Sequence, residues 1–468
     1  MRLLFLLQPG TNSRSIFQDL IAGCRALGHD VLIFELEPIW SLSQRAPQQR
    51  TAVQGDISRM LATFIQNNKI DLTIGMWANA LTTLGLVNHN GKVVTLFDAI
   101  EHPHLMIWLD SPERANDGSI VPLFGAGVMK SPWLFHFINN TGTAAEMTEL
   151  FGFNPDTVLP SRYGINPEVF CPQPDAASKR YDIMFSAGGG DRWQTPTPLM
   201  LDQVKSDEPD LDAIRTELAK QVNPKLDVIS QNFDAATRPA VREVMTQLMT
   251  MQVERRDMPM VDRLNLIRRD DSLTGAVTTF TSRHNLYVQA TQAIRSIEHF
   301  ARAFSFVYLS RFFNCGMFGS ADFSAWGCEV KSAGFVDYDK QAAVYDQAHL
   351  GLSVMRWQDE VGIHIKPMEI AASGVAPLAW SRRGLGDLYT PGKEIVTYEG
   401  LSEAREKVSA LLADPTGLSA LAESAYQRTL RDHTWSSVCA ELLSKIGAVT
   451  GRWNSPASDA ASADSKAA

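Results

Sequence analysis

Short, almost continuously apolar runs alternate with helix-like segments in two separate parts of the chain. The first part opens with RLLFLL, continues with apolar residues at helical spacing (Ile16, Leu20, Cys24 and Leu27), and returns to VLIFEL. Apolar strands separated by helices are typical of a parallel sheet that is covered on both faces. The pattern continues through a helix over 56–67 and predicts further strands at DLTIGM, KVVTLF and HLMIWLD. These residues predict a Rossmann-like domain.

The second part begins at YDIMFSAGGG and resumes after residue 284. There the sequence predicts a helix, then strands at SFVYLSR, VKSAGFV, LGLSVM, APLAW and IVTY. We therefore predict an α/β fold of two Rossmann-like domains that face a cleft. Ligands of such sheets bind at the carboxyl ends of the strands.

The same alternation suggests where the domains begin and end. We expect an N-terminal domain over 1–172 and a C-terminal domain over 178–430, joined by the Pro- and Ala-rich linker PEVFCPQPDAASK. We also expect a helix over 431–450 that returns to the N-terminal domain, with Trp435 and Leu442 packed against it. The last segment, 452–468, is rich in Ser, Ala and Asp without an apolar period, which predicts disorder.

Between these blocks lies a charged, Met-rich helical stretch over 197–283. One interpretation is an inserted subdomain that packs on its neighbour through Met245, Leu248, Met249 and Val253. The other is a surface that binds the acceptor or a second copy of the chain, giving a homodimer, through Arg255, Arg256, Arg268 and Arg269. We favour packing, because runs of charge are usually solvated faces.

Charge and cysteine usage exclude several classes of function. The formal net charge of −9 disfavours a nucleic-acid binder, which needs a basic surface. Five cysteines are scattered without metal-ligand spacing, which indicates reduced thiols. No apolar run is long enough to span a membrane, so we expect a cytoplasmic protein. The two Asp-x-Asp stretches at 210–212 and 337–339 fit helix starts, and no metal site is expected.

Two glycine-containing turns are candidates for ligand contact. Gly10, Thr11 and Asn12 follow the first strand, where free amides at a helix start could hold a phosphate or hydroxyl; a plain tight turn is the simpler interpretation. In SAGGGDRW, Gly188, Gly189 and Gly190 would let backbone approach a ligand, and Arg192 could pair with phosphate. A flexible turn between domains explains that sequence equally well.

The segment GIHIKPMEIAASGVAPLAW carries the most specific signal. His364, Lys366 and Glu369 fall at the start of an apolar helix, whose free amides attract anions. A carboxylate there complements the helix dipole, but a cation does not. Lys366 is easier to explain if it faces a bound phosphate, and Glu369 could accept hydrogen bonds from paired hydroxyls such as those of a ribose.

The sequence resembles the GT-B glycosyltransferases, and within them the CgeB-like proteins. The similarity lies in GFVDYDKQAAVYDQAHLGLSV, IKPMEIAASGVAPL and DHTWSSVCAELL, and in the first half in HLMIWLDSPER and LPSRYGINPEVFCP. The resemblance implies a nucleotide-sugar donor, UDP- or GDP-linked, bound by the C-terminal domain and an acceptor protein or glycan bound by the N-terminal one. No other cofactor is expected.

The resemblance also implies roles for single residues. In related retaining enzymes a Glu-x7-Glu motif places its second Glu on the ribose, and Glu369 matches that position. The first position falls on Val361, and the nearest acid, Glu360, is one residue out of register, which weighs against the retaining assignment. Asp110, with His104 before it, is the expected catalytic group on the acceptor side. Arg192, Arg311 and Lys366 would stabilise the diphosphate instead of a metal.

We therefore expect a metal-independent glycosyltransferase. Two alternatives stay open: a sugar-nucleotide epimerase of the same fold, and a non-catalytic homologue that binds a glycan or scaffolds a partner.

Overall fold

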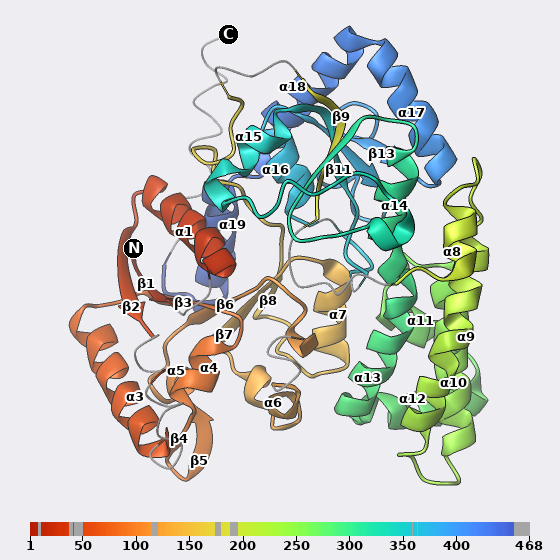
Figure 1. Cartoon of the computed structure of the whole chain (residues 1–468). Coiled ribbons are helices and arrows are strands. Elements are labelled where there is room, and N and C mark those ends of the chain that lie inside the picture. Colours follow the sequence, from red (N-terminus) through yellow and green to blue (C-terminus); the bar gives the residue numbers. More distant parts are fainter. Residues whose placement is uncertain are drawn as a thin grey trace. The chain divides into compact units, whose positions relative to one another are not determined.

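The computed structural model describes residues 1–7, 11–36, 41, 50–114, 120–173, 179–187, 195–357, 359–362 and 364–453. The chain divides into two compact units. Unit 1 contains residues 1–139, 147–164 and 435–468, and unit 2 contains residues 140–146 and 165–434. Each unit is built around one parallel sheet (Figure 1).

The sheet of unit 1 has six strands in the order β2-β1-β3-β6-β7-β8, and all of its pairings are parallel. The burial of β1, β3, β6 and β7 along their whole or nearly whole length explains their apolar sequences. The strands are β1 (Arg2–Leu7), β2 (Asp30–Glu35), β3 (Leu72–Met76), β6 (His104–Trp108), β7 (Leu134–Ile138) and β8 (Val158–Pro160).

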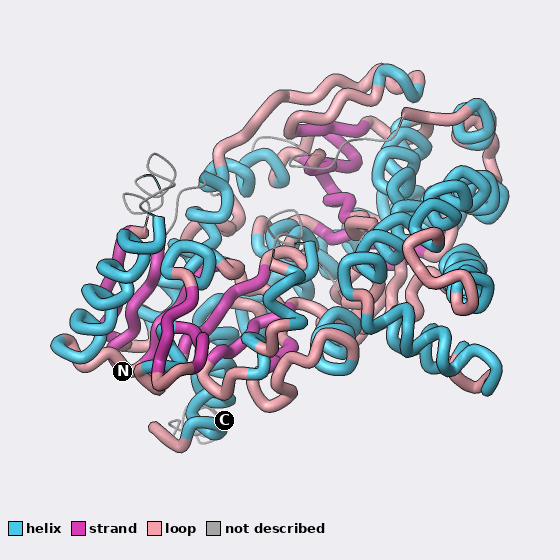
Figure 2. The backbone as a smooth tube through the Cα atoms, turned by 90° about the horizontal axis from the view of Figure 1, so that it is seen from below, coloured by secondary structure: helices cyan, strands magenta, loops and turns pink. Residues whose placement is uncertain are grey.

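Helices flank this sheet, as Figure 2 shows beside the N-terminus. Helix α1 packs against α19, the last helix of the chain, whose Trp435, Leu442 and Leu443 are buried. The helices of this unit are α1 (Thr11–Ala26), α3 (Arg50–Asn67), α4 (Asn79–Leu84), α5 (Leu96–Ala99), α6 (Val121–Gly125) and α19 (Trp435–Thr450). Helix α7 (Thr141–Glu149) is divided between the units.

The sheet of unit 2 has five parallel strands in the order β10-β9-β11-β12-β13. These strands are β9 (Tyr181–Ser186), β10 (Cys315–Phe318), β11 (Ala348–Ser353), β12 (Ala376–Trp380) and β13 (Val396–Tyr398). They are accompanied by α15 (Gln341–Tyr345), α16 (Lys366–Ala372), α17 (Leu401–Ala413) and α18 (Pro415–Asp432).

Of the described residues between β9 and β10, those from 198 to 310 form a helical stretch, and its helices gather in one bundle in Figure 1. Met245, Leu248 and Met249 are buried on α10, which packs on α9 and α12 as the helical spacing predicts. The stretch comprises α8 (Pro198–Gln203), α9 (Leu211–Ser230), α10 (Arg238–Glu254), α11 (Met260–Ile267), α12 (Asp271–Ser282), α13 (His284–Arg295) and α14 (Ala301–Ser310).

Two strand predictions were wrong, and a third was confirmed only in part. SFVYLSR lies in helix α14, which is buried almost all round, so its apolar sequence does not alternate as an exposed helix would. KVVTLF is divided between α5 and β5 (Lys92–Thr95), which forms an antiparallel hairpin with β4 (Leu86–His89) outside the main sheet. VKSAGFV contributes only an isolated bridge from Ser332 to Met317 of β10, a strand that the sequence did not predict.

Candidate functional site

Side chains from three segments gather where β9 and β11 end in unit 2. Arg302 of α14 donates a hydrogen bond from its Nη2 to the Ser186 carbonyl, the last residue of β9, at 3.4 Å. Arg356 follows β11 closely, and Lys366 opens α16. This is the edge at which parallel α/β sheets bind ligands. We call Arg302, Arg356, His364 and Lys366 the cation cluster.

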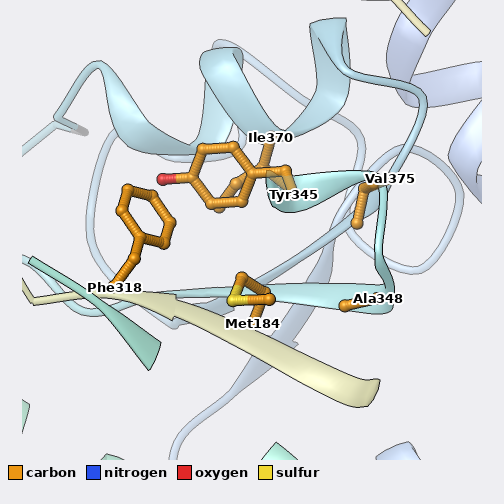
Figure 3. Close-up of a cluster of buried hydrophobic side chains, with 6 residues drawn as sticks. All are labelled: Met184, Phe318, Tyr345, Ala348, Ile370 and Val375. Carbon is orange, nitrogen blue, oxygen red and sulfur yellow. The ribbon is translucent and has the colours of Figure 1, made fainter. Parts of the chain in front are cut away.

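The position of α16 depends on close packing against β11. A Cβ at Gly351 would lie 2.5 Å from the Cγ2 of Ile370, so only glycine lets the helix approach the strand this closely. Figure 3 shows the apolar cluster beneath, with the Tyr345 ring beside Ile370 and above Met184 in the view. Burial raises the pKa of the Tyr345 phenol to about 12, so it is protonated and neutral. A rigid apolar layer therefore supports the first turn of α16.

Lys366 and Glu369 form an ion pair within that turn. The Lys366 Nζ lies 2.6 Å from the Glu369 Oε2 and donates a second hydrogen bond to the Gln341 Oε1 at 3.1 Å. The Glu369 side chain is 2% exposed and that of Lys366 is 26% exposed, so the lysine lies on the solvent side of the pair. Burial lowers the pKa of Lys366, but the Glu369 carboxylate and the Tyr345 phenol together raise it above its usual value, and the ammonium stays charged.

His364 lies among the cations. Burial, together with the nearby positive charges of Arg356, Lys366 and Arg302, holds its pKa well below the usual range. His364 is therefore neutral at neutral pH and can donate or accept a hydrogen bond. The same charges that disfavour its protonation would attract an anion.

Backbone amides contribute less than the sequence suggests. Pro367 has no N–H, and the amides of Met368 and Glu369 donate to the Ile365 carbonyl. The positive potential at the start of α16 therefore comes mainly from side chains.

Glu360 is engaged elsewhere. Its Oε1 lies 2.9 Å from the Arg295 Nε, and its Oε2 accepts a hydrogen bond from the Met260 amide at 3.0 Å. The residue is 6% exposed. The acid that falls one residue out of register is thus part of a buried ion-pair network.

The structure does not bring Arg311 together with the cation cluster. It follows α14 on the side where the strands begin, and its guanidinium donates to the carbonyls of Val204 and Ser206 at 2.7 and 3.0 Å. Gly10, Gly188, Gly189, Gly190 and Arg192 lie outside the described residues, and Thr11 and Asn12 begin α1 with side chains that are not described.

In unit 1, Asp110 and His104 are separated by the length of β6. Asp110 follows the strand at its carboxyl end and is half-buried. His104 begins the strand, fully buried, with its ring stacked on Phe97 and its Nδ1 2.9 Å from the Thr73 Oγ1. Burial lowers the pKa of His104 to about 3. His104 is placed as a neutral core residue rather than as the catalytic group that the sequence suggested.

Sequence reasoning missed Arg302, Arg356 and Tyr345. Arg302 is a charged residue inside an apolar helix, and Arg356 comes directly after a predicted strand. Both are signals that the sequence contains. The part of the chain that the structure describes has no group of three or more His, Cys, Asp and Glu placed to hold a metal ion. None of its described helices is long and apolar enough to cross a membrane.

Comparisons with known proteins give one family match and several structures of similar fold. Residues 295–444 match a family model described as "Glycosyl transferase-like", and this segment contains the cation cluster. No curated protein matches the sequence. Among solved structures, HepE of Anabaena in complex with UDP-glucose is 10% identical, with a TM-score of 0.50 and coverage of 96% of this chain and 100% of that one.

Two further structures align with TM-scores below 0.5. They are a glycosyltransferase from Rickettsia africae (0.47, 9% identity, 97% and 99% of the chains covered) and a putative UDP-N-acetylglucosamine 2-epimerase from Listeria monocytogenes (0.42, 8% identity, 97% and 98% covered). The two parallel sheets and the likeness to HepE show the GT-B type of fold. Together with the matched family model, they support a glycosyltransferase of the GT-B fold.

Proposed function

We propose that the protein transfers a sugar from a nucleotide-sugar donor to an acceptor, and that the cation cluster binds the donor's diphosphate. The observation that carries the proposal is the convergence of Arg302, Arg356 and Lys366 around His364 at the carboxyl ends of β9 and β11. Pairs of phosphates need several cationic donors, and arginine is suited to bind them with two hydrogen bonds.

Lys366 has the geometry for this role. An ammonium group has three N–H donors, and Glu369 and Gln341 accept from two of them. The third can donate to a phosphate oxygen while the ion pair stays intact. We propose that Glu369 mainly orients Lys366, because its carboxylate is almost inaccessible. The ribose contact implied by the resemblance would require this pair to rearrange.

The same cations would offset the charge that develops on the leaving diphosphate. We therefore propose that transfer does not require a divalent ion. The measurement is turnover in excess EDTA: activity should persist, and complete loss that a divalent ion restores would contradict this part of the proposal.

The subtype and the acceptor side are also proposals. The segments HLMIWLDSPER and LPSRYGINPEVFCP support a CgeB-like enzyme acting on a protein or surface glycan. Asp110, half-buried after β6, is the proposed acceptor-side base. Asp110→Asn should then lower turnover while leaving the affinity for nucleotide unchanged. Weakened nucleotide binding in that variant would contradict the assignment.

The direct test is incubation with UDP- and GDP-sugars and candidate acceptors, with products resolved by mass spectrometry and NMR. Released nucleotide with a glycosylated acceptor supports transfer, and the anomeric configuration of the product shows whether the reaction is retaining. An isomerised donor would indicate an epimerase instead. Absence of any conversion, with a glycan bound, would indicate the non-catalytic alternative.

A further inference from the structure

A chain of buried ionic side chains runs through unit 2 outside the cation cluster. Arg295, at the end of α13, lies between two carboxylates: its Nη2 is 2.7 Å from the Glu146 Oε2 and its Nε is 2.9 Å from the Glu360 Oε1. The Tyr287 hydroxyl donates to the other oxygen of Glu146 at 2.7 Å. The side chains of Arg295, Glu146 and Glu360 are 4%, 2% and 6% exposed.

The charges in this network are retained despite burial. Burial lowers the pKa of Arg295, but Glu146 and Glu360 raise it well above its usual range. Burial raises the pKa of Glu360, yet Arg295 and Arg263 lower it by more. One arginine therefore contacts two carboxyl groups from distant parts of the sequence.

The network connects the helical stretch to a turn that lies between two members of the cation cluster in the sequence. Residues 359–362 form this turn, which follows Arg356 and precedes His364 in the sequence. Glu360 fixes it to α13 through Arg295 and to α11 through the Met260 amide. On its other side the Asp359 carbonyl accepts from Arg382 at 2.6 Å, and the Gly362 amide donates to the Arg383 carbonyl at 2.9 Å.

The backbone of the turn leaves little room for adjustment. Gly362 has a φ of 82°, a conformation that residues with a side chain rarely adopt. A buried ion pair is a poor source of stability compared with apolar packing, but its directional hydrogen bonds specify one geometry. A turn that is held in this way restricts the positions of the residues that follow it in the chain.

We propose that Arg295 is a positioning residue for donor binding: by holding Glu360 it fixes the turn 359–362, and thereby places His364 and Lys366 toward the diphosphate. Helix α13 then contributes to the donor site although none of its residues belongs to the cation cluster. The part of this inference that concerns donor binding rests on the proposed function.

The test uses the full-length chain and two conservative arginine substitutions. Arg295→Lys keeps the charge, but one ammonium cannot reproduce the guanidinium's fixed geometry toward two carboxylates. Arg215→Lys is the matched control. Arg215 is also buried and paired, 2.7 Å from both Glu298 and Asp212, but it does not contact the turn.

Affinity for UDP and for GDP is measured by calorimetry, well below the melting temperature of each variant. We expect Arg295→Lys to weaken binding about five-fold or more and Arg215→Lys to change it less than about two-fold, although both lower the melting temperature. Equal effects of the two substitutions, or unchanged affinity in Arg295→Lys, would overturn the proposal.

A second measurement does not depend on any ligand. Hydrogen exchange of the amides in 359–372 should become faster in Arg295→Lys and stay unchanged in Arg215→Lys. If the wild-type chain binds neither nucleotide, the proposed donor specificity fails, whereas this measurement still decides whether Arg295 holds the turn. Equal exchange in both variants would overturn the inference.

Should Arg295→Lys not fold, Tyr287→Phe removes only the hydroxyl that donates to Glu146. Its control is Tyr308→Phe, because the Tyr308 hydroxyl donates to the Asp207 carbonyl at 2.7 Å, away from the network. Faster exchange in 359–372 for Tyr287→Phe alone supports the inference, and no difference between the two contradicts it.

Discussion

Two buried histidines of unit 1 are neutral, whereas two largely buried cations of unit 2 keep their charge. In unit 1, His104 and His136 are fully buried beside aromatic rings, and burial lowers the pKa of each to about 3. In unit 2, Arg295 and Lys366 keep their charge because carboxylates lie beside them. Burial alone therefore does not indicate a binding site: the carboxylates keep these two cations charged, whereas the two histidines are neutral core residues.

The largest expected effect comes from removing the cation of the unit 2 network. Arg295→Met leaves Glu146 and Glu360 buried without their shared partner, which should cost about 3 to 5 kcal/mol of unfolding free energy. This loss of unfolding free energy is measured by urea unfolding, with hydrogen exchange of the α13 amides as the probe. A loss below about 1 kcal/mol would mean that the carboxylates find other partners and that the contrast between the units is weaker than the geometry suggests.

Acid should act on the neutral histidines of unit 1. Their folded pKa values lie below the unfolded value of 6.5, so the unfolded state takes up protons first and stability falls as pH falls below 6.5. Between pH 6.5 and 5.5 each histidine contributes about 1 kcal/mol, or about 2 kcal/mol for both, because the unfolded side chain is only half protonated at pH 6.5. Glu360, whose folded pKa is lowered, loses its contribution only below 4.5.

Exchange of the β6 amides against pH measures this slope. His104→Gln keeps an acceptor for Thr73 and cannot gain a proton. The unfolding free energy of this variant should therefore depend less steeply on pH, by the contribution of one histidine. Arg295→Met should keep the wild-type slope between pH 6.5 and 5.5. An unchanged slope in His104→Gln would show that this histidine is not held neutral.

Adding a Cβ at a closely packed glycine should lower the free energy of unfolding by a smaller amount. The atoms that the new Cβ meets differ between the two units. Gly351→Ala brings a Cβ within 2.5 Å of the Ile370 Cγ2, and overpacking of this size costs about 1 to 3 kcal/mol. Ile370→Ala should relieve the clash in the double variant. In unit 1 the Cβ of Gly164→Ala would lie 2.5 Å from the Trp435 amide nitrogen, where no side-chain truncation can help. Wild-type stability in Gly351→Ala alone would show that α16 can shift away from β11.

The sequence predicts the fold better than it predicts the site, for physical reasons. Continuous apolar runs identify β1, β3, β6, β9 and β11, because a strand that is buried on both faces is apolar at nearly every position instead of at alternate ones. The same signal misassigned α14, since a helix buried all round has the same apolar composition.

The site is harder because its members come from distant segments. Lys366 and Glu369 are recognisable through their spacing in one helical turn, but Arg302 joins them only through the sheet topology. His104 was chosen for its residue type, and nothing in the local sequence reveals that Phe97 stacks on its ring. Glu360 likewise finds its partner Arg295 sixty-five residues away.

The central claim is that the cation cluster of unit 2 binds a diphosphate, and Lys366→Ala tests it most directly, with Arg311→Ala as control. Calorimetric titration with UDP and GDP should show binding weakened by about 1.5 to 3 kcal/mol in Lys366→Ala, roughly 10- to 100-fold. Arg311→Ala should bind as the wild type does, because its guanidinium donates to the Val204 and Ser206 carbonyls and lies 3.8 Å from the Asp207 carboxylate, away from the cation cluster. Wild-type affinity in Lys366→Ala, with only a lowered melting temperature, would mean that Lys366 serves Glu369 and the helix, and would contradict the account.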